Sequence, residues 1–474
     1  MYTSAKKPKS QFIWLFIAAI ILLFGMLGSR EIWTQEHRWA DIVSGMFYRH
    51  DFLHPYLGEN SYYDKPLLSY WLIAVLAWVK GGLSTWSLRI PSALSGLLAI
   101  FSIYRLGTKL KDEKFGLLAG WMLLTTFYFL FWARVSSADM MNIAGALFAV
   151  SWYFDKRDSA RFFDFVVFFL ILAVASLCKG LSAAVIALIA IFPDVISENR
   201  WKNYLRVSVL LSTIPAAVIY LLPFWASNHF GGTHYNESGL YLVYRENILR
   251  YFQPFDHKGP IYTYFIFLPI YLLPWAVFFI PALASLKKRW KNMDASSQWI
   301  VWATLLLFLF FTLSGSRRDY YVLPIVPFAI LLIADWISSA RYFILARRFV
   351  LSFFLVMFAY FVVLQPLYLA GGGLAEFATR MKPYSNYQYV LLDPESKMVF
   401  YLHLPPSIQN HPVSKDLIQI NKKVVYLTRK KYEPSLAQLF KNDFQVVEAK
   451  PTLGDRLLKR TNPNLPVAYV PKLA

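Results

Sequence analysis

The stretch TQEHRWADIVSGMFYRHDFLHPYLGENSYYDKPLLSYW, residues 34–71, follows the first apolar segment of the chain and is rich in charge and in aromatic rings. Only 16% of the 474 residues are charged, so such a concentration is unusual in this sequence. A polar, aromatic loop anchored to a membrane domain is a plausible site of chemistry. We therefore expect the rest of the chain to present this loop, whose charged residues include Glu36, Arg38, Asp41, Arg49, Asp51, Asp64 and Lys65.

The composition is that of an integral membrane protein. Hydrophobic residues make up 57% of the chain, and its 16% of charged residues is well below the roughly 25% of soluble domains. The net charge of +20 comes from short basic clusters between apolar runs, which is typical of positive-inside anchoring and not of a nucleic-acid surface. The single cysteine, Cys178, excludes an internal disulfide and a cysteine-based zinc site.

Apolar runs long enough to cross a bilayer, roughly 17 to 25 residues, recur along the first three quarters of the chain, together with several shorter ones. The run Leu67–Val79 is too short for an easy span, so we expect an interfacial or re-entrant helix there. About eleven candidates result: residues 11–28, 86–106, 115–133, 142–155, 162–178, 181–196, 207–225, 261–285, 298–314, 321–336 and 348–370.

The basic residues orient these spans. Lys6, Lys7 and Lys9 place the N-terminus in the cytoplasm, and the first span lacks a cleavage site, so it should remain as an anchor. The strongly basic loops near residues 109, 156, 200, 287 and 347 then share the cytoplasmic side, and the loop 34–71 is external. We expect a multi-pass membrane protein with a cytoplasmic N-terminus.

After Gly371–Gly373 the composition becomes that of a soluble domain. Short strands are predicted from Val390, Val399, Val424 and Phe444, with a helix over Tyr432–Phe440. The predicted organisation is a transmembrane domain over residues 1–371, with about 11–13 helices and an external loop 29–85 carrying juxtamembrane helices. A small external α/β domain is predicted over residues 372–474.

Cations also lie on the external side, where the orientation rule disfavours them. They occur in residues 133–139, at Lys179, in residues 226–260 and in residues 314–321. Cations kept there suggest a negatively charged partner, and phosphate is the obvious candidate. The alternative is that they pair with Glu36, Asp64 and Asp139 or have no role.

Six motifs, in order along the chain, together resemble the bacterial polyprenyl-phosphate-sugar glycosyltransferases of the GT-C superfamily, in particular its aminoarabinose transferases, which modify lipid A. The resemblance covers residues 32–335. The motifs are EHRWADIVSGM from Glu36, YYDKPLLSYW from Tyr62, ARVSSADMMN from Ala133, CKG from Cys178, ENILRYFQPFDHKGPIYTYFIFLPIYLLPW from Glu246 and SGSRRDYYVLPIVPFAILLIAD from Ser314.

The resemblance implies a polytopic α-helical membrane enzyme of GT-C type that moves a sugar from an undecaprenyl-phosphate-linked donor. The enzyme would lie in a bacterial inner membrane with its C-terminal domain, residues 372–474, in the periplasm. The acceptor would be lipid A or another envelope glycolipid on the periplasmic face, with a protein acceptor still open. Membrane lipids are further partners, no nucleic acid is involved, and a monomer is expected. Which sugar is moved stays open.

The resemblance also implies site residues. The family commonly has an Asp-Glu pair in the first external loop, whereas this chain has Gln35-Glu36, so the catalytic role would pass to Glu36. Asp139 matches the acidic residue of the second external loop. The residues that match the family's donor-phosphate-binding positions are Lys65, Arg38, Arg250 and Lys179. Further motif positions are Asp64, His257, Lys258 and Tyr321.

Glycosyl transfer from a lipid phosphate leaves charge on the departing phosphate, so catalysis needs preorganised cations. It also needs a carboxylate to take or orient the acceptor proton. A divalent metal ion stays open, although no histidine has convincing ligand spacing. Two other functions remain: a transporter or flippase of a lipid-linked sugar, which would place polar and broken helices in matched halves near mid-membrane, and a non-catalytic envelope scaffold.

Overall fold

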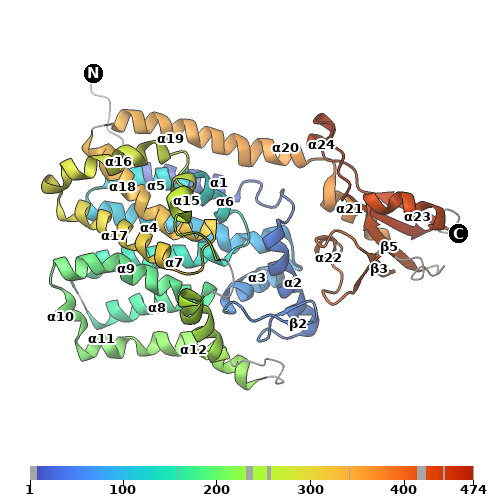
Figure 1. The fold of residues 1–474 in the computed structure, drawn as a ribbon, viewed down its shortest axis with the longest axis horizontal. Coiled ribbons are helices and arrows are strands. Elements are labelled where there is room, and N and C mark those ends of the chain that lie inside the picture. The colour runs from blue at the N-terminus through green and yellow to red at the C-terminus, as the bar shows by residue number, and fades with distance from the viewer. Residues whose placement is uncertain are drawn as a thin grey trace. The chain divides into compact units, whose positions relative to one another are not determined.

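The computed structural model describes residues 8–159, 161–230, 239–253, 258–340, 342–413, 423–440 and 443–472. Contacts within the chain divide it into two units, drawn together in Figure 1. The helical unit comprises Met1–Gly25, Tyr63–Val75 and Arg89–Phe358, and the second unit comprises Met26–Tyr62, Leu76–Leu88 and Ala359–Ala474. Each unit is described by itself below.

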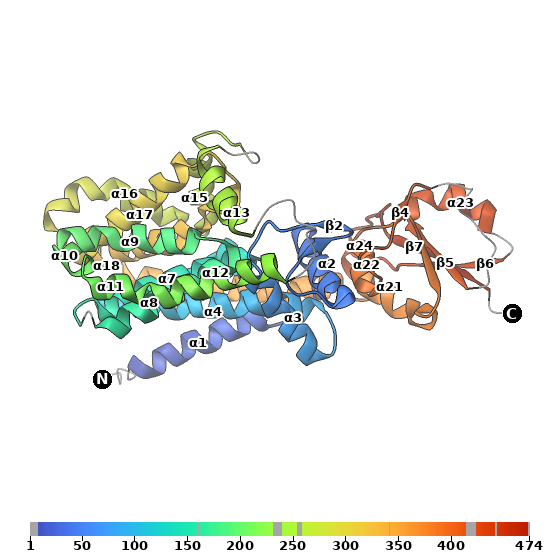
Figure 2. The ribbon, with the colours of Figure 1, turned by 90° about the horizontal axis from the view of Figure 1, so that it is seen from below.

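The helical unit is built from apolar helices, as the composition predicts. Its principal helices are α1 (Pro8–Phe24), α4 (Thr85–Leu110), α5 (Glu113–Leu124), α6 (Phe127–Ala133), α7 (Ala138–Lys156), α8 (Phe162–Lys179), α9 (Ser182–Ser197), α12 (Ile214–His229), α15 (Thr263–Tyr271), α16 (Ala276–Arg289), α17 (Ala295–Leu313), α18 (Val326–Ser339) and α19 (Phe343–Phe358). Helices α7, α8 and α9 pack against one another, and α12 lies along α8 (Figure 2).

Six helices of the described chain are long and apolar enough to cross a membrane, or seven if a bent pair counts as one span. The bent pair is α5 and α6, which meet at 70° although the sequence reads as one apolar run over residues 115–133. Three further apolar helices are shorter, among them α3 (Leu68–Lys80), where the sequence suggested an interfacial or re-entrant helix. The predicted run 261–285 likewise consists of two helices, α15 and α16. The fold is therefore that of a membrane protein with several apolar helices.

Polar side chains tie the helix ends together. Arg134, at the end of α6, donates hydrogen bonds to the last carbonyls of α1, including the Gly25 oxygen at 2.8 Å. Such carbonyls lack partners inside their own helix, so a guanidinium with several donors satisfies them. Arg134 is thus bound to α1.

A second polar cluster gathers helix ends around Asp335, which is fully buried on α18. Its carboxylate accepts a hydrogen bond from Ser297 of α17 at 2.7 Å and forms ion pairs with Lys111, after α4, and Arg289, at the end of α16. Buried charges need such complete pairing, because an unpaired one is costly. The cluster therefore joins four helical segments of the unit.

The second unit contains the C-terminal α/β domain, whose five strands have the order β4-β3-β5-β7-β6. The strands are β3 (Gln388–Leu392), β4 (Asn410–His411), β5 (Val424–Arg429), β6 (Phe444–Glu448) and β7 (Pro466–Pro471). Strands β3, β4 and β5 are parallel, whereas β7 runs antiparallel to β5 and β6. Helix α23 (Glu433–Phe440) confirms the predicted helix, and β3, β5 and β6 confirm three predicted strands.

One predicted strand was wrong and two were missed. The run from Val399 lies largely in helix α22 (Met398–Tyr401), because a short apolar run fits a buried helical turn as well as a strand. Strand β7 lies between β5 and β6 although it begins at Pro466. A proline is tolerated at the first position of a strand, where its missing N–H breaks no inner ladder bond. Strand β4 has only two residues.

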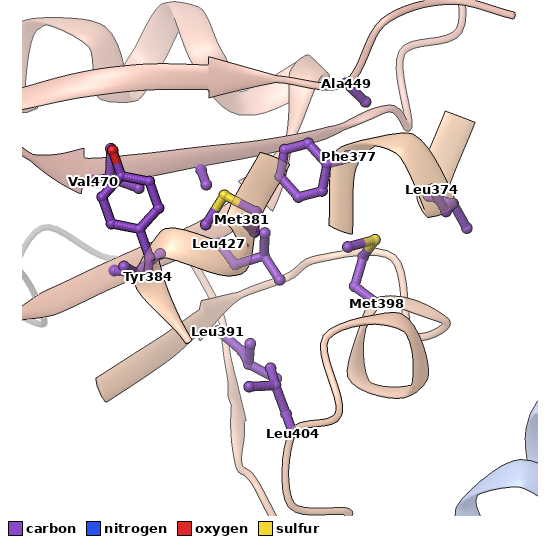
Figure 3. Packing of buried hydrophobic residues seen from close by; sticks show 12 residues of the cluster. Leu374, Phe377, Met381, Tyr384, Leu391, Met398, Leu404, Leu427, Ala449 and Val470 are labelled. Atoms are coloured by element: carbon purple, nitrogen blue, oxygen red, sulfur yellow. The ribbon is translucent and has the colours of Figure 1, made fainter. Parts of the chain in front are cut away.

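One face of this sheet packs against helix α21 (Gly373–Met381) and α22. Figure 3 shows the apolar core between them, with Phe377, Met381 and Met398 directed toward Leu427 and Leu391. The other face packs against α23 through Leu436 and Phe440. Both faces of the sheet are therefore covered, which explains why the first five of the six residues of the central strand β5 are buried.

The remaining part of the second unit includes helix α2 (Thr34–Arg49) and a two-stranded hairpin, β1 (Tyr56–Leu57) and β2 (Asn60–Ser61). These lie in the charged stretch of residues 34–71. Glu31 accepts a hydrogen bond from the Leu374 amide at 2.7 Å, and the Ile32 amide donates to the Tyr401 hydroxyl at 3.0 Å. The start of the loop is thus fixed to α21 and α22.

Candidate functional site

The helical unit contains a cavity of about 170 Å³ that brings several motif residues together. Its polar lining includes Lys65, Asp139, Lys179 and Tyr321, which the sequence predicted as site residues. Its apolar lining comes from α7, α9, α17 and the segment after α17: Ile143, Val185, Ile186, Phe310, Phe311 and Pro324. The cavity thus combines two lysines and two carboxylate residues, Asp139 and Glu246, with an apolar wall.

Asp139 and Lys179 form an ion pair at this cavity. Asp139 lies in the first turn of α7, where Ser137 caps the helix: the Ser137 hydroxyl donates to Asp139 Oδ2 at 2.9 Å and accepts from the Asp139 amide at 3.1 Å. The Lys179 ammonium lies 4.9 Å from the centre of the Tyr321 ring. The helix dipole favours a carboxylate at a helix N-terminus, so it stabilises Asp139 in the first turn of α7.

Two asparagines hold the turn that carries Lys179. Asn247 Oδ1 accepts a hydrogen bond from the Leu181 amide at 2.7 Å, and Asn142 Nδ2 donates to the Gly180 carbonyl at 3.3 Å. Gly180 has φ of 118°, and a Cβ there would lie 2.8 Å from Asn247 Oδ1. Only glycine fits this conformation and this close approach. The turn is therefore specified by Gly180 and both asparagines.

Lys65 also lines this cavity. It belongs to the motif YYDKP and lies near the start of the segment Tyr63–Val75 of the helical unit. Its ammonium donates to the Asp64 carboxylate at 3.1 Å and to the Asp64 carbonyl at 3.1 Å. Its side chain is only 17% exposed, so its cation is held in a partly desolvated place. Asp64 is thus the ion-pair partner of Lys65.

The far side of the cavity is closed by the segment after α17. Tyr251 donates from its hydroxyl to the Phe310 carbonyl at 3.0 Å, and its own carbonyl accepts from the Gly315 amide at 3.0 Å. Lys258, another predicted position, pairs through its backbone with Ser316, which lines the cavity. The exposed Lys258 side chain is not among the cavity's lining residues.

Gln35, Glu36 and Arg38 belong to the other unit, on α2. The Glu36 side chain is fully buried at the start of this helix, where its Oε2 accepts from the Trp33 amide at 2.8 Å and lies 3.5 Å from Arg30. Arg38 donates to the Tyr62 hydroxyl at 2.7 Å. Glu36 therefore caps the N-terminus of α2. Its catalytic role stays a prediction.

Of two further predicted positions, Arg250 is described only in part and His257 is not described. Arg250 begins helix α14 (Arg250–Phe252), but its side chain lies outside the described residues. His257 also lies outside them. In the part of the chain that the structure describes, no group of three or more His, Cys, Asp and Glu side chains could hold a metal ion.

The sequence reasoning did not single out Asn142, Ser182, Glu246 or Asn247, all of which line the cavity. Ser182 donates to Asn142 Oδ1 at 2.9 Å and so completes the asparagine's bonding. One signal was present for Asn142, because an amide inside an apolar helix needs a buried partner. Glu246 and Asn247 stood within a motif but carried no local pattern that distinguished them from their neighbours.

Comparison with known proteins agrees with the resemblance that the motifs indicate. Residues 64–226 match the family described as dolichyl-phosphate-mannose-protein mannosyltransferase. The undecaprenyl phosphate-alpha-4-amino-4-deoxy-L-arabinose arabinosyl transferase of Pectobacterium atrosepticum is 28% identical over 349 residues, which are 72% of this chain and 61% of that protein. The enzyme of the same description from Shewanella sediminis is 27% identical over 340 residues, 69% of this chain and 59% of its own.

The alignments thus span about three fifths of the length of these curated relatives. Among solved structures, ArnT from Cupriavidus metallidurans bound to undecaprenyl phosphate has a TM-score of 0.70 at 16% identity, with 97% of both chains covered. The Archaeoglobus fulgidus oligosaccharyltransferase in complex with Zn and sulfate has a TM-score of 0.52 at 12% identity and covers 90% of this chain and 68% of that one.

At these identities the structural matches show the fold, and the sequence matches show the relationship. Both confirm the resemblance that the motifs indicated. The chain has the GT-C fold and is similar, over about 70% of its length, to the undecaprenyl phosphate-aminoarabinose transferases.

Proposed function

We propose that the chain transfers a sugar from an undecaprenyl-phosphate-linked donor to lipid A or another envelope glycolipid. The observation that carries this proposal is the placement of Lys65, Lys179 and Asp139 at one cavity with an apolar wall. The named activity of the relatives supports the same reaction class. An aminoarabinose-like sugar is the first choice of substrate, with another pentose or a hexose as the alternative.

The two lysines are suited to hold the donor phosphate. In the reaction the bond between the sugar's anomeric carbon and the phosphate oxygen breaks, and undecaprenyl phosphate leaves with the electron pair. Lys65 and Lys179 would stabilise the charge that develops on this oxygen, because preorganised cations in a poorly solvated site act strongly on such charge. Arg38 and Arg250 stay predicted phosphate contacts.

The ion pair between Lys179 and Asp139 gives the donor a way to activate the site. An arriving phosphate competes with Asp139 for the Lys179 ammonium. Once Lys179 turns to the phosphate, the Asp139 carboxylate is released. It can then accept the proton of the acceptor's nucleophilic oxygen while that oxygen forms the new bond to the anomeric carbon.

Glu36 is the second predicted carboxylate. Its side chain accepts a backbone hydrogen bond at the start of α2, so its first task is to hold this helix. We therefore assign the acceptor's proton to Asp139 and keep Glu36 as a carboxylate to be tested beside it. Matched substitutions of the two residues separate these roles.

The apolar wall suits a donor that carries a long hydrocarbon tail. Phe310, Phe311, Ile143 and Val185 offer apolar surface next to the cations, which a soluble sugar nucleotide would not need. The cavity of about 170 Å³ is smaller than the roughly 300–1,000 Å³ of ligand pockets, so donor entry must widen it. Separation of Lys179 from Asp139 is one movement that would do so.

The topology proposed from the basic loops completes this function. The N-terminus would be cytoplasmic, and both the cavity and the C-terminal domain would face the periplasm of a bacterial inner membrane. The protein would work as a monomer on lipid substrates, with the acceptor's identity decided by its headgroup.

The experiment uses the purified chain in lipid nanodiscs with undecaprenyl phosphate carrying labelled 4-amino-4-deoxy-L-arabinose, and lipid A as acceptor. We expect labelled lipid A and an equal amount of free undecaprenyl phosphate. Lys65→Ala should lower the rate by about 10²–10³-fold, because it removes a donor to the developing charge. Lys287→Ala, a change of an exposed lysine at the end of α16, is the control and should leave the rate unchanged.

In sealed proteoliposomes, intact donor crossing the bilayer without release of undecaprenyl phosphate would contradict the transferase and support the transporter. Full activity of Lys65→Ala would remove the proposed phosphate site. If labelled undecaprenyl phosphate is released but lipid A stays unlabelled, the reaction class stands and the acceptor is wrong. A panel of envelope glycolipids analysed by mass spectrometry then identifies the acceptor.

A further inference from the structure

The C-terminal domain carries an open groove that the catalytic proposal does not use. Its volume is about 680 Å³. Five of its described lining residues are cations and one is a carboxylate, Glu448. The cations are Arg380, Lys430, Lys431, Lys450 and Arg460.

Some of this positive charge is neutralised within the domain. Lys430 pairs with Glu448 at 2.7 Å, and Arg380 and Lys450 lie 3.2 and 3.8 Å from Glu376. Lys431 lies 3.8 Å from Asp393. An excess of cations nevertheless remains, because three carboxylates face five basic side chains. The Lys450 side chain is 64% exposed, so its charge is available to a ligand in the groove.

The groove lies next to the end of an apolar helix. Helix α19 continues through Ala359–Leu364 into α20 (Gln365–Leu369), so that residues 343–369 form one apolar helix of 27 residues. Its most apolar stretch has a mean hydropathy of 2.2 and is only 11% buried, so its surface suits a lipid environment. At 1.5 Å per residue it is about 40 Å long, enough to cross the roughly 30 Å hydrocarbon core. Its last residue, Leu369, should therefore lie at the membrane surface.

Two of the chain segments that line the groove, residues 446–451 and 460–465, are tied to this helix end, the second through a hydrogen bond from Arg460 to the Tyr368 hydroxyl at 3.5 Å. The Leu453 amide donates to the Ala370 carbonyl at 2.8 Å, and the Gly373 amide donates to the Lys450 carbonyl at 2.9 Å. Gly454 lies against the Tyr368 ring so closely that a Cβ would come within 2.1 Å of it. The groove is thus held within a few residues of the membrane boundary.

Between these segments, helix α24 (Leu453–Leu457) exposes apolar side chains. Leu457 is 73% exposed and Leu458 is 55% exposed, and Arg456, Lys459 and Arg460 stand beside them. Adjacent exposed leucines flanked by cations are typical of a segment that inserts into the interfacial layer of an anionic membrane. The leucines and the groove's cations would then meet the same lipids.

We propose that this groove binds the phosphate headgroup of an anionic membrane lipid, while Leu457 and Leu458 insert beside it. The interaction ties the C-terminal domain to the bilayer surface. It does not depend on the catalytic proposal, because neither the groove nor α24 shares a residue with the cavity of the helical unit.

The test uses the full chain in nanodiscs of phosphatidylcholine, alone or partly replaced by phosphatidylglycerol, and follows hydrogen exchange of residues 448–465. We expect slower exchange only when phosphatidylglycerol is present. Each removed cation near a membrane surface should weaken binding by about fivefold. Lys450→Gln with Arg460→Gln should therefore abolish the protection at a phosphatidylglycerol content that half-protects the unaltered protein.

The matched control is Lys382→Gln with Lys472→Gln, which removes two exposed charges of the same domain outside the groove's lining. It should retain the protection. A third arm adds inorganic phosphate to phosphatidylcholine nanodiscs, and protection there would replace the lipid with a free anion and overturn the proposal. Equal exchange in both nanodiscs would overturn it too. Loss of protection in Leu457→Ser with Leu458→Ser, at unchanged thermal stability, would support insertion.

Discussion

Asp139 is held by three neighbours of different kinds: the Ser137 hydroxyl, its own helix N-terminus and Lys179. This explains how an acidic side chain can stay in an apolar unit. It also explains how a phosphate can exchange places with it. Lys179 pairs with Asp139 in the structure. The proposed reaction releases Asp139 from this ion pair.

Asp139→Asn tests this exchange. The amide keeps the shape of the side chain but loses the ion pair with Lys179, so the donor phosphate no longer competes with a carboxylate. Undecaprenyl phosphate should bind at least as tightly as to the unaltered protein, while transfer falls by about 10²–10⁴-fold because the base is lost. Binding is measured by native mass spectrometry and transfer by the labelled donor. Weaker binding together with full transfer would refute the exchange.

Gly180→Ala tests the turn that carries Lys179. The turn's φ of 118° is unfavourable for alanine, and the added Cβ would press on Asn247. A strained backbone of this kind costs about 1–3 kcal/mol. We expect a lower melting temperature in detergent and a loss of transfer. Gly82→Ala is the control, because a Cβ there meets nothing within 4 Å and its φ is not positive.

At the scale of elements, the cluster around Asp335 explains how α4, α16, α17 and α18 stay together at one end of the helical unit. Asp335→Ala would leave Lys111 and Arg289 without their buried partner. Breaking a buried ion pair in this way costs about 3–5 kcal/mol. We expect a marked drop in the temperature of thermal unfolding. Asp155→Ala, which breaks a more exposed pair with Arg105, should change that temperature little.

The C-terminal sheet offers a test by pH. The Tyr432 hydroxyl, which donates to Asp393 at 2.5 Å, and the Arg429 guanidinium hold the pKa of the Asp393 carboxyl below its ordinary value of 3.8. A lowered carboxyl pKa stabilises the fold above the unfolded value, and this stability is lost as the pH falls through the folded value. The domain should therefore become more sensitive to pulse proteolysis by pepsin below about pH 4.

Asp393→Asn should remove this part of the pH dependence. Asparagine tolerates the positive φ of 49° at this position, so the backbone need not change. The variant should be less stable than the unaltered protein at neutral pH and should approach it in acid. Asp443→Asn controls for the lost charge. An unchanged pH profile in Asp393→Asn would show that other carboxyls govern acid sensitivity.

At the scale of the whole molecule, periodicity and motifs predicted most of the architecture. Long apolar runs such as 321–336 lie in helices long and apolar enough to cross a membrane, because a helix satisfies its own backbone groups where lipid offers them no partners. The bend between α5 and α6 was not predictable, since the run around Thr125 and Thr126 carries no glycine or proline there. Short apolar runs in the C-terminal domain failed for another reason: packing chose helix α22 over a strand.

The candidate site divides in the same way. Lys65, Asp139, Lys179 and Tyr321 could be found from their motifs, and the structure places them at one cavity. Asn247 could not, because its role depends on a turn 66 residues away in the chain. Glu36 shows the converse limit, since a carboxylate that caps a helix and one that takes part in catalysis look alike in a sequence.

The central claim is that Lys65 and Lys179 hold a lipid phosphate in the helical unit. The most direct test is a titration of the purified chain with undecaprenyl phosphate, followed by native mass spectrometry, in the unaltered protein, Lys65→Ala, Lys179→Ala and Lys287→Ala. The account predicts that each of the first two substitutions weakens binding by at least about tenfold, as expected when a charge-assisted contact is lost, and that Lys287→Ala does not. Equal affinity in all four proteins would contradict it.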